Sequence, residues 1–251
     1  MSLTFYLITA PVVFVFSGLL AMAGLGAAFL FVPFFYYLGV PFAEVVPVAL
    51  LLNAISLSFA TVNYWRGGLI DWRIALPVGI VAVAFAPFGA RLTPHVDKTT
   101  LLVLFAVFLL FAGAMMLFYK GRARAENAST AGIWLVGAGV GGTAGFIGGL
   151  LGVGGGNIIV PALNWLGLEA KRAAATTAVA VVFSSLSGFL GHVTLGKMNL
   201  TFLGIMAIMA AGGSLAGSQL VTQKLSSSQL KKIIGVLLWL IAAKMFFDVF
   251  K

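Results

Sequence analysis

The most constraining feature of this chain is an internal repeat with an offset of 128 residues. Residues 24–39 read GLGAAFLFVPFFYYLG and residues 152–167 read GVGGGNIIVPALNWLG, so six of sixteen positions are identical. Chance would give roughly one or two identities in a chain of this apolar bias. The same offset continues without a gap and aligns Ser56 with Ser184 and Gly89 with Gly217. The chain therefore consists of two copies of one unit, and its fold must be built twice.

Composition indicates whether this unit folds in water or in a lipid bilayer. The chain is 61% hydrophobic and only 8% charged, whereas a soluble domain is about 25% charged. Apolar runs of about 20 residues recur along its length, and a helix needs about that length to cross a bilayer. The ten-residue alternation of membrane β-strands is not visible. We predict an all-α integral membrane protein that is embedded in the lipid bilayer.

Charged residues divide the chain into segments. Residues 1–43 and 127–168 contain no charged residue, and each stretch is too long for one span and short for two. We predict a broken or re-entrant helix in each stretch, with a pair of short spans as the open alternative. Three ordinary spans should follow each of them. The predicted boundaries are 5–38, 42–65, 73–92 and 99–119 in the first repeat, and 131–166, 171–195, 200–221 and 229–250 in the second.

The basic residues predict how these segments cross the membrane. If each charge-free stretch returns to its own side, ten basic residues gather on one side and five on the other; if each crosses once, the split is eight against seven. Cytoplasmic loops are enriched in Lys and Arg, so we favour the first arrangement. It divides the chain into membrane repeat 1–120, cytoplasmic linker 121–130 and membrane repeat 131–251. Both termini are then outside, and the two repeats are inverted relative to each other.

Several functional classes are excluded by composition. The chain has no cysteine, two histidines far apart in sequence and six carboxylates, which leaves a metal site or an enzyme without its usual residues. The net charge of +9 comes from basic residues in short loops between spans rather than from a patch suited to nucleic acid. We therefore expect no cofactor, no metal, no enzymatic activity and no nucleic-acid partner.

The glycine-rich stretches are the best candidates for a functional site. Residues 148–157 contain six glycines, which cannot propagate a stable helix. Inside a bilayer, such a break is tolerated only within protein or against a water-filled cavity. The helix that resumes near Gly155 points its N-terminal N–H groups at the break, and these groups together with the helix dipole favour an anion. Matching interrupted segments in two halves indicate the binding site of a secondary transporter.

The two breaks differ, and not every glycine belongs to a site. Ala27, Ala28 and Phe29 occupy the positions of Gly155, Gly156 and Asn157, so the second break should make more of the substrate contacts. We assign four glycines spaced by four to close helix packing instead: Gly137, Gly141, Gly145 and Gly149. Single hydroxyls commonly bond within their own helix, which remains the alternative for the Ser and Thr residues. The predicted substrate-binding residues are Gly24, Gly26, Asn53, Gly152, Gly154, Gly155, Gly156, Asn157, Thr176, Thr177 and Ser184.

Tyr64 and His192 are equivalent in the repeat and lie near the ends of their predicted spans. In the inverted arrangement they would lie toward opposite sides of the membrane, which suits a pair of gates. The unperturbed pKa of histidine is near 6.5, so His192 could also carry a coupling proton. The alternative for both is a place in the interfacial aromatic belt, with Trp65 beside Tyr64.

This combination of motifs resembles the TauE/SafE sulfite exporter family, also called TSUP. The resemblance covers essentially the whole chain. It lies in the Gly-x-Gly-Gly-Gly…Pro element, intact at 152–161 and partial at 24–33, in the run TTAVAVVFSSLSG at 176–188, and in His192-x-x-x-Gly196. It implies export or uptake of a small sulfur-containing or organic anion such as sulfite, thiosulfate, sulfoacetate or another sulfonate. The departures at Ala27, Ala28 and Phe29 leave the role of those positions open.

We therefore predict a multi-pass secondary transporter in the inner (cell) membrane of a bacterium or archaeon. It should move a small anion by alternating access, with coupling to protons and without a prosthetic group. An anion channel with the same midplane site is the alternative, because a channel would share its donors and charge pattern. The sequence leaves open the identity of the anion, the direction of transport and whether the chain forms a homo-oligomer.

Overall fold

The computed structural model describes residues 3–118, 130–192, 200–223 and 227–249, and within these ranges the chain is helical without any strand. The first repeat contains α1 (Leu3–Met22), α2 (Ala28–Tyr37), α3 (Phe42–Arg66), α4 (Trp72–Leu92), the short 3-10 helix η1 (Thr93–His95) and α5 (Lys98–Phe118). The second contains α6 (Thr130–Leu151), α7 (Gly156–Trp165), α8 (Ala170–His192), α9 (Leu200–Gln223) and α10 (Ser227–Val249). Apart from Thr130, the predicted linker 121–130 lies outside the described residues.

The predicted all-α membrane fold is confirmed. Within the described ranges, six helices are long and apolar enough to cross a membrane: α1, α3, α4, α6, α8 and α9. Each charge-free stretch is a broken helix, as predicted, and not a pair of equally short spans. Each combines a helix of 20 or 22 residues with one of only ten. At 1.5 Å per residue the ten-residue helices are about 15 Å long, half the thickness of the hydrocarbon layer.

The 128-residue offset applies to the elements as well as to the sequence. α2 and α7 begin and end at equivalent residues, and α3 and α4 begin at the equivalents of the first residues of α8 and α9. Helix packing follows the same equivalence, because α1 packs along α9 while its counterpart α6 packs along α4. Two helices pack against their own counterparts, α3 against α8 and α5 against α10. The first helix of each repeat thus packs on the third long helix of the other repeat, which is α9 for α1 and α4 for α6.

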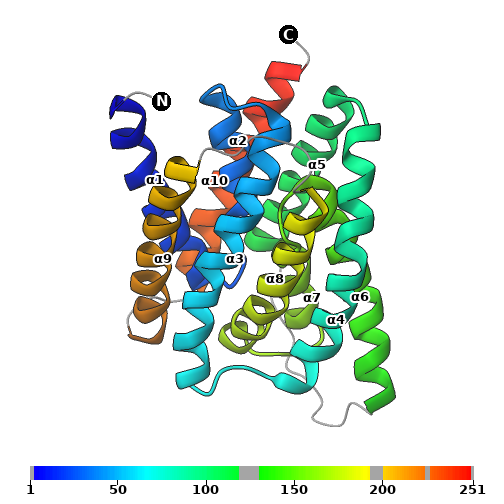
Figure 1. The fold of residues 1–251 in the computed structure, drawn as a ribbon. Helices are drawn as coiled ribbons and strands as arrows, with labels where there is room; N and C mark the ends of the chain where they lie inside the picture. The colour runs from blue at the N-terminus through cyan, green and yellow to red at the C-terminus, as the bar shows by residue number, and fades with distance from the viewer. Residues whose placement is uncertain (1–2, 119–129, 193–199, 224–226, 250–251) are drawn as a thin grey trace.

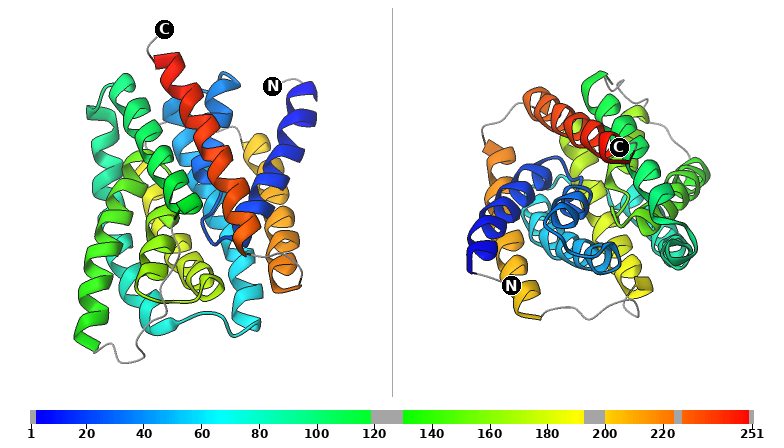
Figure 2. Two further views of the ribbon diagram at one scale, coloured as in Figure 1. Left: turned by 180° about the vertical axis from the view of Figure 1, so that it is seen from behind. Right: turned by 90° about the horizontal axis from the view of Figure 1, so that it is seen from above.

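The directions of the helices can be followed in the ribbon. Both termini lie at one end of the molecule, and α3 begins at that same end, so α1 and α2 together return the chain to the side where it started (Figure 1). α4 runs toward the end that holds the termini, whereas its counterpart α9 runs away from it (Figure 2). The long helices surround the two half-length helices, which places both breaks in the interior.

The glycine stripe on α6 is a packing surface, as predicted. A Cβ atom on Gly137, Gly141, Gly145 or Gly149 would overlap the backbone or a side chain of α4, at Pro77, Val78, Ala82 and Ala86 in turn. Small residues let two helix backbones approach closely where side chains would hold them apart. The stripe fixes α6, and with it the start of the second break, against the neighbouring repeat.

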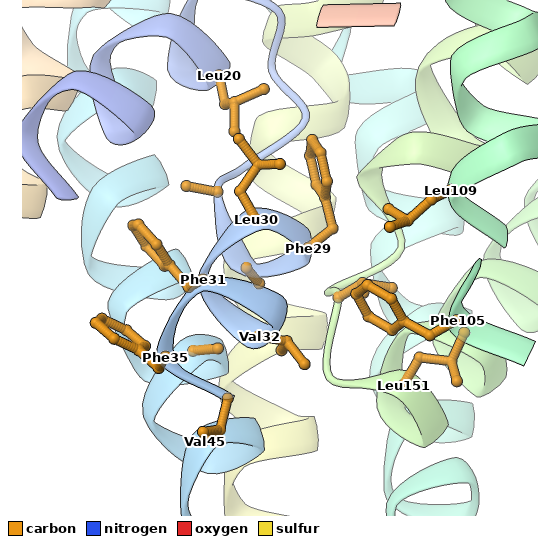
Figure 3. Packing of buried hydrophobic residues seen from close by; sticks show 14 of the residues in the cluster. Leu20, Phe29, Leu30, Phe31, Val32, Phe35, Val45, Phe105, Leu109 and Leu151 are labelled. Atoms are coloured by element: carbon orange, nitrogen blue, oxygen red, sulfur yellow. The ribbon is translucent and has the colours of Figure 1, made fainter. Parts of the chain in front are cut away.

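Aromatic and aliphatic side chains fill the space around the first half-helix. Every residue from Ala28 to Pro33 is buried, so α2 is apolar on all sides. Figure 3 shows Phe29 and Leu30 beside Leu20 of α1, with Phe105 and Leu109 of α5 nearby in the same cluster. Hydrophobic packing of α2 against α1 and α5 therefore closes the first break.

Candidate functional site

Both long helices end before their breaks in the same way. At the end of α1 the Leu25 N–H donates to the carbonyl of Leu20 at 3.2 Å, and at the end of α6 the Val153 N–H donates to Gly148 at 2.9 Å. These bonds reach back five residues and close a Schellman turn, which requires a left-handed residue. Gly24 and Gly152 supply it, with φ values of 66° and 71°. The sequence folds into two breaks of one design because these glycines recur.

Each break lies against the long helix of the other repeat. A Cβ on Gly24 would overlap the backbone of Ala174 in α8, and a Cβ on Gly152 would lie 2.6 Å from Val46 in α3. Val46 and Ala174 are themselves equivalent in the repeat. The two breaks also touch each other, because a Cβ on Gly156 would overlap the carbonyl of Leu25. The two breaks therefore meet at one place in the interior.

Asn53 lies between the two breaks and bonds to both sides. Its Oδ1 accepts the backbone N–H of Ala28 at 3.2 Å, and its Nδ2 donates to Ser185 Oγ at 2.9 Å. Its side chain is fully buried. A Cβ on Gly26 or on Gly154 would overlap or closely approach this amide. Asn53 therefore joins the start of α2 to α8 and occupies the space that two glycines leave free.

The second break is held by a neighbouring hydroxyl. Ser184 Oγ donates to the carbonyl of Gly154 at 2.9 Å. Ser184 and Ser185 are both buried on α8. The pair therefore fixes Gly154 from one side and Asn53 from the other. Ser185 was not among the predicted binding residues, although it lies in the polar run at 176–188.

The start of α7 is buried and has no side-chain cap. The first intrahelical bonds of α7 are donated by Ile158 and Ile159 to Gly155, so the N–H groups of Gly156 and Asn157 precede them. Among the described residues, neither N–H has an acceptor. The Asn157 side chain is 1% exposed, and both its amide oxygen and its amide nitrogen are unpartnered. Buried amides are normally hydrogen-bonded. The start of α7 therefore has three unpaired donors, which are the N–H groups of Gly156 and Asn157 and the Nδ2 of Asn157.

The two predicted threonines have different surroundings. Thr176 Oγ1 accepts the backbone N–H of Asp71 at 3.0 Å and so fixes the connection between α3 and α4. Thr177 is fully buried, and its hydroxyl has no partner. Thr176 is thus committed to a structural bond, whereas Thr177 keeps a free donor.

Tyr64 and His192 make equivalent contacts in the two repeats. The Tyr64 hydroxyl donates to the carbonyl of Ala21, and His192 Nε2 lies 3.0 Å from the carbonyl of Gly149. Ala21 and Gly149 are equivalent positions in the last turns of α1 and α6. Because a carbonyl only accepts, Nε2 must carry the hydrogen. Both side chains are at most 1% exposed, so an interfacial place for them is excluded. Each donates to a carbonyl in the last turn of a helix, and the Ala21 carbonyl also accepts the N–H of Gly24 at 3.0 Å.

No group of three or more potential metal ligands occurs among the described residues. The donors that meet at the breaks are instead neutral amides, hydroxyls and backbone N–H groups. These groups suit an anion that is held without a fixed counter-charge.

Comparison with known proteins gives the family of the chain and several relatives. The sequence profile of the family described as sulfite exporter TauE/SafE matches residues 9–245. The chain is 25% identical to the probable membrane transporter protein YunE of Bacillus subtilis, over 94% of this chain and 97% of that protein. It is 26% identical to the probable membrane transporter protein MJ0441 of Methanocaldococcus jannaschii, over 90% and 89% of the two chains. It is also 26% identical to a probable membrane transporter protein of Sinorhizobium fredii, y4hK, over 79% and 81%. No solved structure matches it.

Proposed function

The chain belongs to the TauE/SafE sulfite exporter family, and from that premise we propose that it is a secondary transporter whose anion site is the uncapped start of α7. The observation that carries the proposal is the buried, unpartnered amide of Asn157 beside the free N–H groups of Gly156 and Asn157. A helix N-terminus has a partial positive charge and oriented donors. An anion there would accept hydrogen bonds from these two N–H groups and from Asn157 Nδ2, while Asn157 Oδ1 can only accept and does not bind the anion.

The substrate class is a small sulfur-containing or organic anion. Sulfite, thiosulfate, sulfoacetate and other sulfonates each present two or three oxygens to separate donors. Gly154, Gly155 and Gly156 allow the backbone to approach such oxygens, and Thr177 adds a hydroxyl donor on α8. Asn53 and Ser184 position the break, because both already hold it by hydrogen bonds.

Alternating access is supported by the arrangement of the two repeats. Counterpart helices such as α4 and α9 run in opposite directions (Figure 2), as expected for inverted repeats. Rocking of one repeat against the other would move the breaks relative to α3 and α8 and expose the site to each side in turn. We place the protein in the cell membrane with both termini outside, as the basic residues predict.

Proton coupling through His192 can be separated from its structural bond. Protonation at Nδ1 would leave the Nε2–Gly149 bond in place. Glutamine at this position keeps an N–H donor and cannot titrate. If His192 carries the coupling proton, His192→Gln should flatten the pH profile of transport between about pH 5.5 and 7.5 while keeping the melting temperature. A variant with normal rate and normal pH dependence would remove His192 from coupling.

The proposed function is tested by binding and transport with one preparation. Purified protein is heated with sulfite, thiosulfate, sulfoacetate or a carboxylate of similar size, since a ligand stabilises by RT ln(1 + [L]/Kd). We expect at least one sulfur anion to raise the melting temperature and to enter proteoliposomes with saturable kinetics and counterflow. Flux that does not saturate and shows no counterflow would indicate the channel instead. Stabilisation by none of the sulfur anions would overturn the substrate class.

A further inference from the structure

Polar side chains form a continuous row between α3 and α9. Asn63 Nδ2 donates to Ser218 Oγ at 2.7 Å, Ser218 Oγ donates to the carbonyl of Ser214 at 2.7 Å, and Ser214 Oγ donates to the carbonyl of Ser56 at 2.5 Å. The three serines are fully buried. The row begins three residues before Arg66, at the end of α3, and reaches Ser56, one helical turn from Asn53. It therefore joins one end of the molecule to the breaks.

The equivalent interface between α4 and α8 has different chemistry. The positions of Asn63, Ser214 and Ser218 are taken there by Gly191, Ala86 and Ala90. A Cβ on Gly191 would lie 2.8 Å from the Cβ of Ala90. This interface also has a hydrogen bond, from Ser187 Oγ to the carbonyl of Val83 at 2.8 Å, but it has no row. Since both interfaces pack equivalent helices, packing alone does not require polar residues between α3 and α9.

Three buried hydroxyls near this row have no partner within the described residues: Ser17 of α1 and Ser56 and Thr61 of α3. Ser17 lies one turn before Ala21, whose carbonyl accepts the hydroxyl of Tyr64 of α3, so this face of α1 is turned toward α3. A buried hydroxyl without a partner destabilises the fold, and a buried water usually binds where several such polar groups lie close together.

We propose that the seam between α3 and α9 is the hydrated path by which a small anion reaches the breaks from the Arg66 end, and that the seam between α4 and α8 is its sealed counterpart. The proposal rests on the proposed function for the identity of the anion that moves along this path. The donors of the row are already paired, so the unpartnered hydroxyls of Ser17, Ser56 and Thr61 are the groups that can donate to a passing anion without trapping it, as pore linings do. Arg66 and Arg73, both exposed at this end, would draw anions to the entrance.

The absence of native cysteine allows a matched accessibility test. Ser214→Cys and Ser218→Cys are compared with their repeat equivalents Ala86→Cys and Ala90→Cys, all four at buried positions. The full-length variants are placed in lipid nanodiscs and treated with N-ethylmaleimide. We expect the two α9 cysteines to react at least tenfold faster than the two α4 cysteines. In sealed vesicles, an impermeant maleimide should reach Ser218→Cys from the same face as a reference cysteine at Arg66.

Three results would overturn the path. These are equal rates at the two seams, faster reaction at Ala86→Cys and Ala90→Cys, or reaction from the face opposite Arg66. If a serine variant does not fold, Thr61→Cys against Phe189→Cys repeats the comparison at another pair of equivalent positions. Uptake of sulfoacetate by the unmodified protein is measured in the same lipid. Equal labelling with intact uptake overturns the path alone, whereas no uptake of any sulfur anion overturns the proposed function whatever the labelling rates.

Discussion

The two breaks share one backbone design and differ in what they leave unpaired. At the first, the N–H of Ala28 is taken by Asn53, and Phe29 packs in the apolar cluster. At the second, the N–H of the equivalent Gly156 is free, and Asn157 is buried without a partner. The two breaks therefore share a turn but differ in which hydrogen-bonding groups are left unpaired. We infer that the start of α2 has a structural role, because the N–H of Ala28 is already paired, and that the anion binds at the start of α7.

Backbone conformation explains why the residue types differ. Gly155 precedes α7 with φ at 82°, a left-handed conformation that favours glycine, whereas the equivalent Ala27 has φ at −98°. Alanine is therefore tolerated at the first break and disfavoured at the second. The second break keeps its glycines because its backbone passes against Leu25, Asn53 and Ser185.

The largest expected effect comes from a side chain at the contact between the breaks. Gly156→Val places methyl groups against the Leu25 carbonyl and over the free N–H groups. We expect anion affinity to fall by well over tenfold, or more than about 1.4 kcal/mol. Ala28→Val, at the equivalent position, should have a smaller effect because a Cβ is already present there. Titration of the stabilising anion against both purified variants measures the difference.

Melting temperature decides how that result is interpreted. If Gly156→Val only disturbs packing, the surviving folded protein binds the anion with unchanged affinity and melts at a lower temperature. That outcome would remove the anion site from α7. Equal losses of affinity in Gly156→Val and Ala28→Val would contradict the division of roles between the two breaks.

Asn157→Ala should weaken binding and leave the fold intact. The amide makes no hydrogen bond to the described residues, so its removal leaves no protein group unpaired. A hydrogen bond to a charged ligand contributes about 1.5–3 kcal/mol, which corresponds to a loss of affinity of about tenfold to a hundredfold. Calorimetric titration gives the affinity, and a thermal scan without ligand should show no decrease. A lower melting temperature with normal affinity would make Asn157 structural.

Asn53→Val should give the opposite pattern. Valine is the residue at the equivalent position 181, so it fits this kind of surface but loses the bonds to Ala28 and Ser185. The free energy of unfolding should fall by about 1–3 kcal/mol because a buried N–H loses its acceptor. Thermal unfolding measures this loss. Unchanged stability would mean that Asn53 does not hold the first break, and the start of α2 would then be as available as that of α7.

The smallest expected effect comes from removing the hydrogen bond that Tyr64 donates to the end of α1. Tyr64→Phe removes one of the two donors to the Ala21 carbonyl, since the Gly24 N–H remains, and keeps the ring. A single buried hydrogen bond contributes about 1 kcal/mol, which corresponds to about 2–4 °C in melting temperature for a chain of this size. Because the first break binds no anion in our account, affinity should stay the same. A tenfold loss of affinity in Tyr64→Phe would show that both breaks act on the ligand.

The sequence predicted the elements well because the repeat constrained them. The Gly-Pro stretches predicted two broken helices, and the spacing of four predicted the packing role of Gly137 to Gly149. The partners of single side chains could not be predicted, because they depend on which helices cross. Asn53 and Ser185 are 132 positions apart, and Thr176 bonds a loop 105 positions away. Tyr64 and His192 were recognised as equivalents, but their carbonyl partners carry no signal in the sequence.

Asn53 has a consequence for how a duplicated chain of this kind can evolve. Its amide occupies the space beside Gly26 of its own half and Gly154 of the other half, and it donates a hydrogen bond to Ser185 of the other half. A tandem of two first halves would contain the amide twice, but phenylalanine would stand at both positions of Asn157. A tandem of two second halves would contain Asn157 twice and valine at both positions of the amide. Neither half can therefore revert to an independent, self-paired ancestor, since the contacts that join the breaks belong to the fused chain as a whole.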